Sequence, residues 1–309
     1  MVHNLTLEFT DYKKYPALWA KRLGISIEAV ELYLESEVID PHTDSFIWKR
    51  IFGYDMGKRH KPRPFFSQVD FPRCLEANMS GIVWDLATNP LNRDKNKLEV
   101  ARRNIDLILD EFNKYSEHFQ HTVSYSDYLS ARKKNKVACF MSIQGGQAID
   151  NNLDNLDKIP EIHRITLVHF TKSKIGASNA DIRNKSTGLS DFGKDFVRKM
   201  VDNKILVDLS HINRKGFFDA LEAVPDSIVV VTHTGVNGVY QCWRNIDDQQ
   251  IKAVSETGGT VGIIYHPKFL AKTIVNCSID SIIDHLAHVI NVAGEDCPTL
   301  GSDYDGLIY

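Results

Sequence analysis

Histidine and aspartate side chains fall at the ends of short apolar runs that lie far apart in this sequence. These residues are His42, Asp44, His211, His233 and Asp303. Side chains alternate along a strand, so His42 and Asp44 share one face. Imidazole and carboxylate groups are the ligands that Zn²⁺ or a similar divalent ion takes in catalytic sites. A lone histidine at a strand end is more often a structural hydrogen-bonding group. The prediction of a metal site therefore rests on several of them coming together.

Asp303, His169 and Arg244 are candidates for roles besides metal binding. Asp-Gly is usually a turn, but Asp303 continues directly from an apolar run and is preferred over Asp305. Its carboxylate can contact an ion and take a proton from a water. His169 ends the run Arg164–Val168 and can donate to a carbonyl or oxyanion. Arg244 follows His233 in the sequence, and its guanidinium can bind a substrate carboxylate through two hydrogen bonds. It can equally be an ordinary salt-bridged arginine.

The elements that must position these residues alternate between strands and helices. Strands are predicted at Val38–Asp44, Ser80–Thr88, Lys136–Gly145, Arg164–Phe170, Ile205–His211, Ser227–Thr234, Gly259–His266 and Thr299–Asp303. Helices are predicted at Lys97–Tyr115, Asp191–Asn203, Arg214–Ala223, Asp247–Thr257 and Ile279–Val292. This order predicts an α/β protein, a (β/α)8 TIM barrel with its metal site at the C-terminal ends of the strands. A doubly wound open sheet is the alternative, but no Gly-rich loop follows the first strand.

The 309 residues are expected to form a single TIM-barrel domain. Residues 1–36 form an N-terminal helical cap with helices at Tyr15–Arg22 and Ser26–Ser36, and the barrel begins at residue 37. The proline-containing segment His60–Pro72 is a long irregular loop that overhangs the mouth. The sequence stops at Tyr309, directly after the eighth strand, so no eighth helix is expected.

Composition excludes several classes of partner. The net charge of −3 and the dispersed basic residues give no nucleic-acid surface and no polybasic membrane anchor. The five cysteines form no C-x-x-C pair, which fits free thiols in a reducing compartment. No signal-peptide core occurs in the first 25 residues, and no apolar stretch is long enough to span a bilayer. A cytoplasmic location without membrane contact is therefore expected.

Taken together, these residues resemble the membrane (renal) dipeptidase family, the M19 peptidases of the amidohydrolase superfamily. The motifs that carry the resemblance run in order from about residue 38 to residue 306. They are D-x-H-x-D as Asp40–Asp44, G-L-T-x-F-G as Gly188–Gly193, D-L-[AS]-H as Asp208–His211, [ST]-H-[ST] as Thr232–Thr234, R-N as Arg244-Asn245, and G-[GS]-D-[FY]-D-G as Gly301–Gly306.

The resemblance implies a dipeptide hydrolase with two zinc ions at a barrel mouth. One ion is expected on His42 and Asp44, and the other on His211 and His233. His169 is expected to polarise the scissile carbonyl and to contact the substrate. Arg244 is expected to bind the substrate's terminal carboxylate, and Asp303 to act as general base and then acid. The resemblance also implies a homodimer.

One position departs from the family pattern. Where the family has E-G-G, with a glutamate that bridges the two metals, this chain has Gln144-Gly145-Gly146. Gln144 is still the expected bridging ligand, but a neutral amide holds two cations together poorly. We therefore expect one tightly bound ion and a weak second site. The alternatives are a mononuclear hydrolase of another C–N or lactone bond, and a catalytically impaired protein that only binds a ligand.

Overall fold

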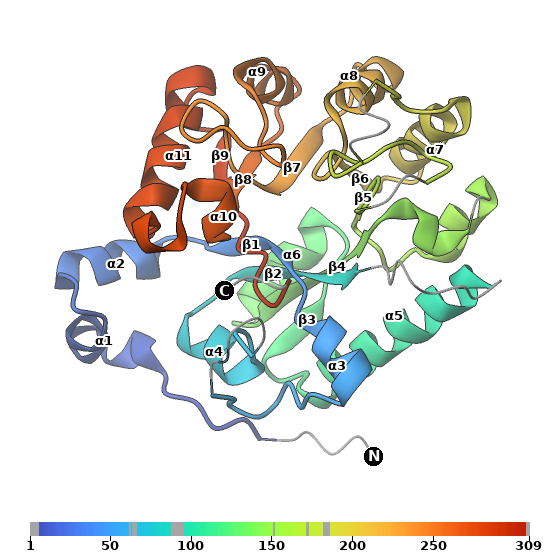
Figure 1. Cartoon of the computed structure of the whole chain (residues 1–309). Helices are drawn as coiled ribbons and strands as arrows, with labels where there is room; N and C mark the ends of the chain where they lie inside the picture. The colour runs from blue at the N-terminus through green and yellow to red at the C-terminus, as the bar shows by residue number, and fades with distance from the viewer. Residues whose placement is uncertain are drawn as a thin grey trace.

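The computed structural model describes residues 6–61, 63, 67–87, 96–150, 152–170, 173–181 and 186–306. Parallel strands follow one another around a ring in the order β1-β2-β4-β5-β6-β7-β8-β9. Their bounds are β1 Ile39–Thr43, β2 Gly81–Ala87, β4 Val137–Gln144, β5 Arg164–Thr166, β6 Leu206–Asp208, β7 Val229–Thr234, β8 Val261–Ile263 and β9 Pro298–Leu300. Helices surround these strands (Figure 1). The predicted (β/α)8 barrel is confirmed in preference to the open sheet.

The helices lie close to the predicted positions. The five predicted barrel helices are present as α5 Lys97–Lys114, α7 Asp191–Asp202, α8 Arg214–Ala223, α9 Asp248–Glu256 and α11 Ile279–Ala293. Side chains cap their N-termini. In α7, for example, the side chain of Ser190 accepts a hydrogen bond from the backbone N–H of Gly193. Among the helices of the described residues, none is long and apolar enough to cross a bilayer.

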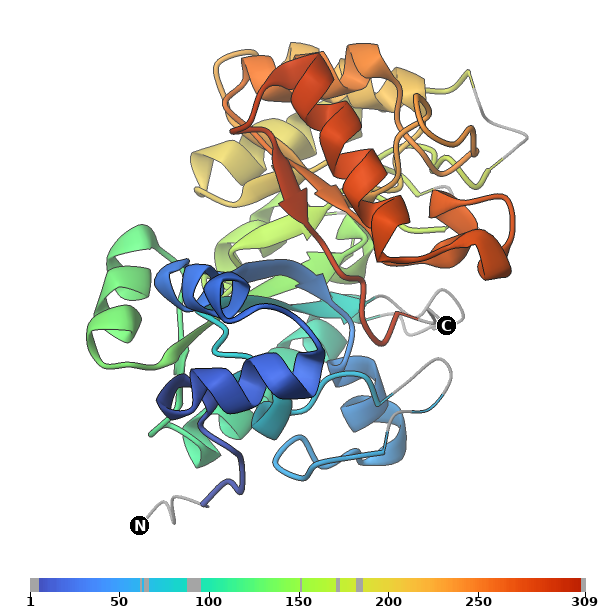
Figure 2. The ribbon, with the colours of Figure 1, turned by 90° about the vertical axis from the view of Figure 1, so that its left-hand side faces the viewer.

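The N-terminal segment carries two of the predicted helices, α1 Pro16–Leu23 and α2 Ile27–Glu35. They lie outside the ring of strands (Figure 2). Other short elements were not predicted: α3 Phe46–Phe52, α4 Phe71–Glu76, α6 Tyr125–Lys133 and α10 Pro267–Leu270, with 3₁₀ segments η1 Tyr12–Lys14, η2 Gly146–Ile149, η3 Leu153–Lys158 and η4 Ile274–Asn276.

Strand β3, Phe119–His121, was also missed. It pairs with β4 outside the ring, and its three residues form no apolar run. Pro72 of the predicted irregular loop lies inside α4, because Asp70 caps that helix. Pro62, Pro64 and Thr88, which were part of predicted elements, lie outside the described residues.

Several strands are shorter than predicted at their C-terminal ends. Strand β5 ends at Thr166, β6 at Asp208 and β9 at Leu300. The chain then turns through left-handed backbone at Phe170, His211 and Asp303, with φ values of 46°, 66° and 56°. Such values are uncommon for residues other than glycine and end the extended conformation. The predicted functional residues His169, His211 and Asp303 therefore lie just beyond the strands rather than in them.

The ring closes through the segment that follows β9, which runs down past β1 (Figure 2). The backbone N–H of Asp303 donates to the carbonyl of His42 at 3.1 Å, and that of Asp44 donates to Tyr304 at 2.9 Å. Thr43 and Tyr304 form a parallel bridge. Closure is therefore made at the mouth by the same residues that carry the predicted chemistry.

Side chains on β2 show how the strand divides its two faces. Trp84 lies outward, with ring centroids 5.3 Å from Phe46 and 5.8 Å from Phe71 in the main apolar core. Asp85, the next residue, is fully buried on the opposite face inside the ring. The barrel wall is thus apolar, while the interior near the mouth carries charge.

Close backbone contact at the closing strands requires glycine. A Cβ on Gly301 would lie 1.7 Å from the carbonyl oxygen of Thr232. Because that oxygen belongs to the backbone, it cannot easily move away. We expect Gly301→Ala to destabilise the protein by about 1–3 kcal/mol through overpacking. Urea unfolding followed by circular dichroism measures this, with Thr299→Ala in the preceding strand β9 as a control of small effect. Equal stability of Gly301→Ala and wild type contradicts the prediction.

Candidate metal centre

The predicted site residues converge at one end of the ring. All of them are buried, and they come from the ends of six strands or the loops that follow. They are His42 in β1, Asp44 after it, Gln144 at the end of β4, His169 after β5, His211 after β6, His233 in β7, Arg244 in the loop after β7, and Asp303 after β9. The structure therefore brings together every residue that was predicted to take part in the chemistry.

The centre of the site is a group of imidazole rings. Nε2 of His211 lies 2.8 Å from Nε2 of His233. The side-chain nitrogen of Gln144 lies 3.3 Å from Nε2 of His42, 3.3 Å from Nε2 of His211 and 3.5 Å from Nε2 of His233. The rings of His42 and His233 stack with centroids 3.8 Å apart. Gln144 thus occupies the central position among the three histidines.

Two carboxylates reach the same point. Nε2 of His42 lies 3.4 Å from Oδ1 of Asp303 and 3.9 Å from Oδ2 of Asp44. A Cβ on Gly306 would meet both carboxylates, at 2.5 Å and 2.8 Å, so glycine there permits their approach. Ligand atoms of His42, His233 and Asp303 all lie within 4.8 Å of one another. This grouping combines members of both metal pairs that the family resemblance implies.

Local backbone irregularities aim the two central histidines. The pairing of β1 with β2 shifts register between Asp40 and Thr43, and that of β7 with β8 shifts between Val231 and Thr234. His42 and His233 lie inside these two shifts. Bulges of this kind re-aim a side chain and are common beside active sites.

The charges at the site fit a cation. Burial raises the pKa of Asp44 well above its usual value, against the attraction of His42. Oδ1 of Asp44 is buried and has no hydrogen-bond partner among the described residues. Burial also holds the pKa values of His211 and His233 well below the usual range, which keeps both rings neutral. Neutral imidazoles beside a buried carboxylate oxygen that has no hydrogen-bond partner suit a divalent ion.

His42 differs from the other two histidines. Burial opposes its protonation, but the charge of Asp85 and hydrogen bonds to Asp303 and Asp85 outweigh burial and raise the pKa of His42 to about 10. The ring therefore lies in a strongly negative environment. That environment would equally favour a cation bound at Nε2.

His169 and Arg244 lie beside the imidazoles. The ring centroid of His169 is 4.8 Å from that of His211, and burial lowers the pKa of His169 to about 3. Its Nδ1 is buried without a hydrogen-bond partner among the described residues. Arg244 is 2 % exposed, and one arm donates to the carbonyl of His233 at 2.8 Å. A neutral imidazole and a buried guanidinium thus face the same mouth.

Asp305, which was not preferred for the chemistry, makes hydrogen bonds that join two segments of the chain. Its carboxylate accepts from Oγ of Ser45 at 2.6 Å and from the backbone N–H groups of Gln68 and Val69 at 2.9 Å and 3.2 Å. These bonds fix the described part of the loop after α3 against the closing segment.

A group of charged residues beneath the histidines was missed in the sequence. Arg164, Asp85 and Asp208 are fully buried inside the ring, and Arg164 forms ion pairs with both carboxylates. A charged residue within an apolar strand, as in Gly81-Ile82-Val83-Trp84-Asp85-Leu86-Ala87, was the available signal. Which acid pairs with which base was not available without the fold.

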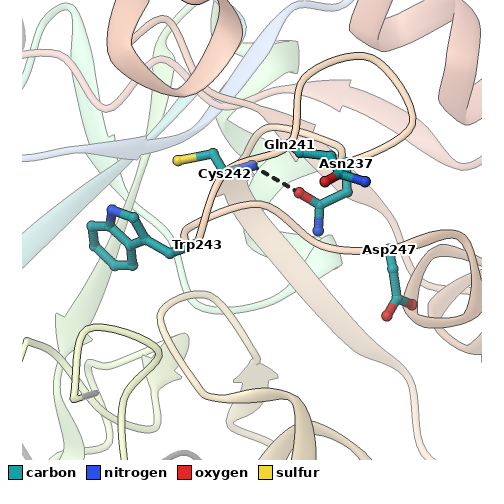
Figure 3. A pocket seen from close by; sticks show the side chains of 5 residues that line it. All are labelled: Asn237, Gln241, Cys242, Trp243 and Asp247. Atoms are coloured by element: carbon teal, nitrogen blue, oxygen red, sulfur yellow. Dashed lines mark hydrogen bonds between the residues drawn. The ribbon is translucent and has the colours of Figure 1, made fainter.

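A hollow of about 460 Å³ lies in the loop between β7 and α9 (Figure 3). It is lined by Asn237, Gln241, Cys242, Trp243 and Asp247. The backbone N–H of Cys242 donates to Asn237 within it. None of the clustered histidines or carboxylates lines this hollow, so it is distinct from the candidate metal centre.

Comparison with known proteins agrees with the geometry. Residues 27–308 match the family described as membrane dipeptidase, peptidase family M19. An uncharacterised dipeptidase of Schizosaccharomyces pombe is 26% identical over 291 residues, which span 87% of this chain and 69% of the relative.

Two solved structures share the fold. The dipeptidase AC, a metallopeptidase of family M19, superposes with a TM-score of 0.77 at 24% identity, over 87% of this chain and 85% of that one. A Rhodobacter sphaeroides metallopeptidase with a phosphinate mimic of the dipeptide L-Ala-D-Ala gives 0.75 at 23% identity, over 87% and 86%. Because the family match covers nearly all of the barrel, this chain belongs to the membrane dipeptidase family, M19, a family of metal-dependent dipeptidases.

Proposed function

We propose that this protein hydrolyses dipeptides or similar small amides with the help of a divalent ion at the barrel mouth. The ion is zinc or another that takes the same ligands. The observation that carries the proposal is the convergence of three imidazoles and two carboxylates beside a buried arginine. The Rhodobacter metallopeptidase, which is liganded with a dipeptide mimic, supports the same substrate class.

The side chains divide the work by their chemistry. His42, His211, His233, Asp44 and Asp303 are the residues that would hold the ion, with Gln144 among them. An ion bound there supplies Lewis acidity, which activates a water and polarises the scissile carbonyl.

The remaining roles belong to Asp303, which is itself a candidate ligand, and to His169 and Arg244 beside the cluster. The carboxylate of Asp303 accepts the proton of the attacking water and later returns it to the leaving amine. His169 is neutral because of its low pKa, so it donates a hydrogen bond to the carbonyl oxygen instead of a proton. Arg244 binds the terminal carboxylate of the substrate.

We further propose that one ion is bound tightly and a second weakly. Asp44 and Asp303 approach Nε2 of His42, whereas Asp85 lies on the Nδ1 side and pairs with Arg164. The two charges of Asp44 and Asp303 balance a single divalent ion. Gln144 adds a ligand without charge at the position between the histidines. A second cation would lack an anion between it and the first.

Two other functions are alternatives that the following experiments distinguish. Hydrolysis of another C–N or lactone bond by a mononuclear site would leave dipeptides poor substrates, whereas a binding protein without activity would hold metal and hydrolyse neither. A homodimer and a cytoplasmic location stay predictions of the sequence.

The metal role predicts a loss of bound ion on mutation. His42→Ala and His233→Ala should each lower zinc content to well below one ion per chain and abolish hydrolysis. Circular dichroism should show an intact fold, because the apolar core lies on the other side of the strands. Elemental analysis of protein purified without chelator measures the ion, with His118→Ala, distant from the mouth, as the control. Full metal content in both site variants contradicts the assignment.

Arg244 predicts a preference for a free terminal carboxylate. Losing a charge-assisted two-armed contact costs on the order of 2–3 kcal/mol, or tens- to a hundredfold in kcat/KM. Dipeptides should therefore be hydrolysed faster by that factor than their C-terminally amidated forms, and Arg244→Met should remove the difference. Equal rates of wild type on both substrates would exclude this role for Arg244.

Gln144 predicts a gain of function. Gln144→Glu restores the bridging charge at almost unchanged volume, so zinc content should approach two ions per chain. Dipeptide hydrolysis should rise at least tenfold, about 1.4 kcal/mol of barrier. Isothermal titration with Zn²⁺ and initial rates measure the two effects. If the wild type holds two ions tightly and the variant is no faster, Gln144 does not weaken the second metal site.

A further inference from the structure

Arg164 connects most of the barrel interior. Its side chain, about 1% exposed, contacts residues on six strands. The contacts are His42 on β1, Asp85 on β2, Ser142 on β4, Thr166 on β5, Asp208 on β6 and Thr232 on β7. Three charged groups buried together are costly to desolvate, and apolar side chains often fill such a space with no loss of stability. Their place directly beneath the histidines suggests another use.

One branch of this network reaches His42. Oδ2 of Asp85 lies 3.3 Å from Nδ1 of His42. That oxygen is held in turn by Nη2 of Arg164 at 2.8 Å and by Oγ of Ser142 at 2.5 Å. Nη2 of Arg164 also lies 3.1 Å from Nδ1 of His42. When His42 binds an ion through Nε2, its Nδ1 carries a proton. Nδ1 of His42 and Nη2 of Arg164 are then both donors, and the carboxylate of Asp85 is the acceptor that they share.

The other branch reaches His233. Oγ1 of Thr232 lies 2.9 Å from Nδ1 of His233 and donates to Asp208 at 2.8 Å. Nη1 of Arg164 donates to Thr232 at 3.0 Å and pairs with Asp208. Since Thr232 gives its only proton to Asp208, its oxygen is free to accept the Nδ1 proton of His233.

Both branches fix the same feature of the two rings. A proton held on Nδ1 leaves the lone pair on Nε2, and in both histidines Nε2 faces the cluster at the mouth. Partners of this kind set the orientation and basicity of metal-binding histidines.

We propose that Asp85, Arg164 and Asp208 form one positioning unit that aligns His42 and His233 together for a single ion. Asp85 positions His42, Asp208 acts on His233 through Thr232, and Arg164 joins the two branches. The proposal rests on the proposed metal role of the two histidines. It adds three residues that do not touch the ion or the substrate themselves.

The test is the affinity of the purified protein for Zn²⁺, measured by competition with a chromophoric chelator. Asp85→Asn replaces an acceptor-only group by an amide that can also donate to Nδ1, so it no longer selects one tautomer. Thr232→Val removes the link to His233. Each should raise the Kd for Zn²⁺ by about 10–100-fold.

A matched control separates positioning from general stability. Asp219→Asn also alters a buried aspartate in an ion pair, with Lys215 at 2.8 Å, but it lies on α8 away from the histidines. It should change the Kd for Zn²⁺ less than twofold. The ¹⁵N shifts of histidine side chains in the zinc-loaded protein should show protons on Nδ1 of His42 and His233, and a mixture for His42 in Asp85→Asn.

The joint role of Arg164 is tested by combining variants. If Arg164 joins the branches, Asp85→Asn with Thr232→Val should raise Kd by less than the product of the single effects. Arg164→Lys, which keeps the charge but cannot span both carboxylates, should weaken Zn²⁺ binding while the protein stays folded.

Three outcomes overturn the proposal. Multiplicative effects in the double variant would exclude a joint unit. Unchanged Zn²⁺ affinity in Asp85→Asn and Thr232→Val would exclude positioning altogether, if His42→Ala still loses the ion. A drop in affinity for Asp219→Asn equal to that for Asp85→Asn would reduce the network to a structural role. Zinc retained by His42→Ala would instead refute the proposed metal site itself.

Discussion

The charge of one buried arginine, Arg164, constrains the interior of this barrel. Arg164 lies where a TIM barrel usually packs branched apolar side chains, so its guanidinium must find acceptors within the ring. Asp85 and Asp208 supply them from strands on either side, and hydroxyl groups of Ser142, Thr166 and Thr232 complete the set. Polar residues at one level of six strands thus depend on one another, and the histidines rest directly on that level.

Closure of the ring and the chemistry at its mouth also depend on common residues. The segment after β9 pairs with β1 through Asp303 and Tyr304, places the carboxylate of Asp303 beside His42, and buries Asp305 against the loop after α3. Because one short stretch closes the barrel and supplies the proposed general base, changes in this segment affect stability and activity together. Glycine at 301 and 306 allows both kinds of close approach.

The ring of strands, and the placing of His42, His169, His211, His233 and Asp303 at its C-terminal end, could be predicted from local patterns in the sequence. Gln144 was predicted only from the family motif. Apolar runs mark parallel strands, and the C-terminal ends of such strands meet in a barrel. The register shifts that aim His42 and His233 depend on pairing between strands, so no local pattern reveals them. The same holds for Arg164, whose partners come from segments up to 122 residues away. Strand β3 escaped because three residues carry too little periodicity.

The candidate site works against the stability of the fold that presents it. His211 and Asp303 adopt left-handed backbone, the imidazole nitrogens of His211 and His233 approach to 2.8 Å, and Asp44 keeps a buried oxygen without a hydrogen-bond partner among the described residues. The left-handed backbone and the unpartnered oxygen of Asp44 each cost free energy, and a cation at the clustered imidazoles would give that buried carboxylate a partner. The ion that the site binds is therefore expected to stabilise the closed barrel as well, since any ligand that prefers the folded chain shifts unfolding in its favour. Binding and closure are coupled because they use the same residues.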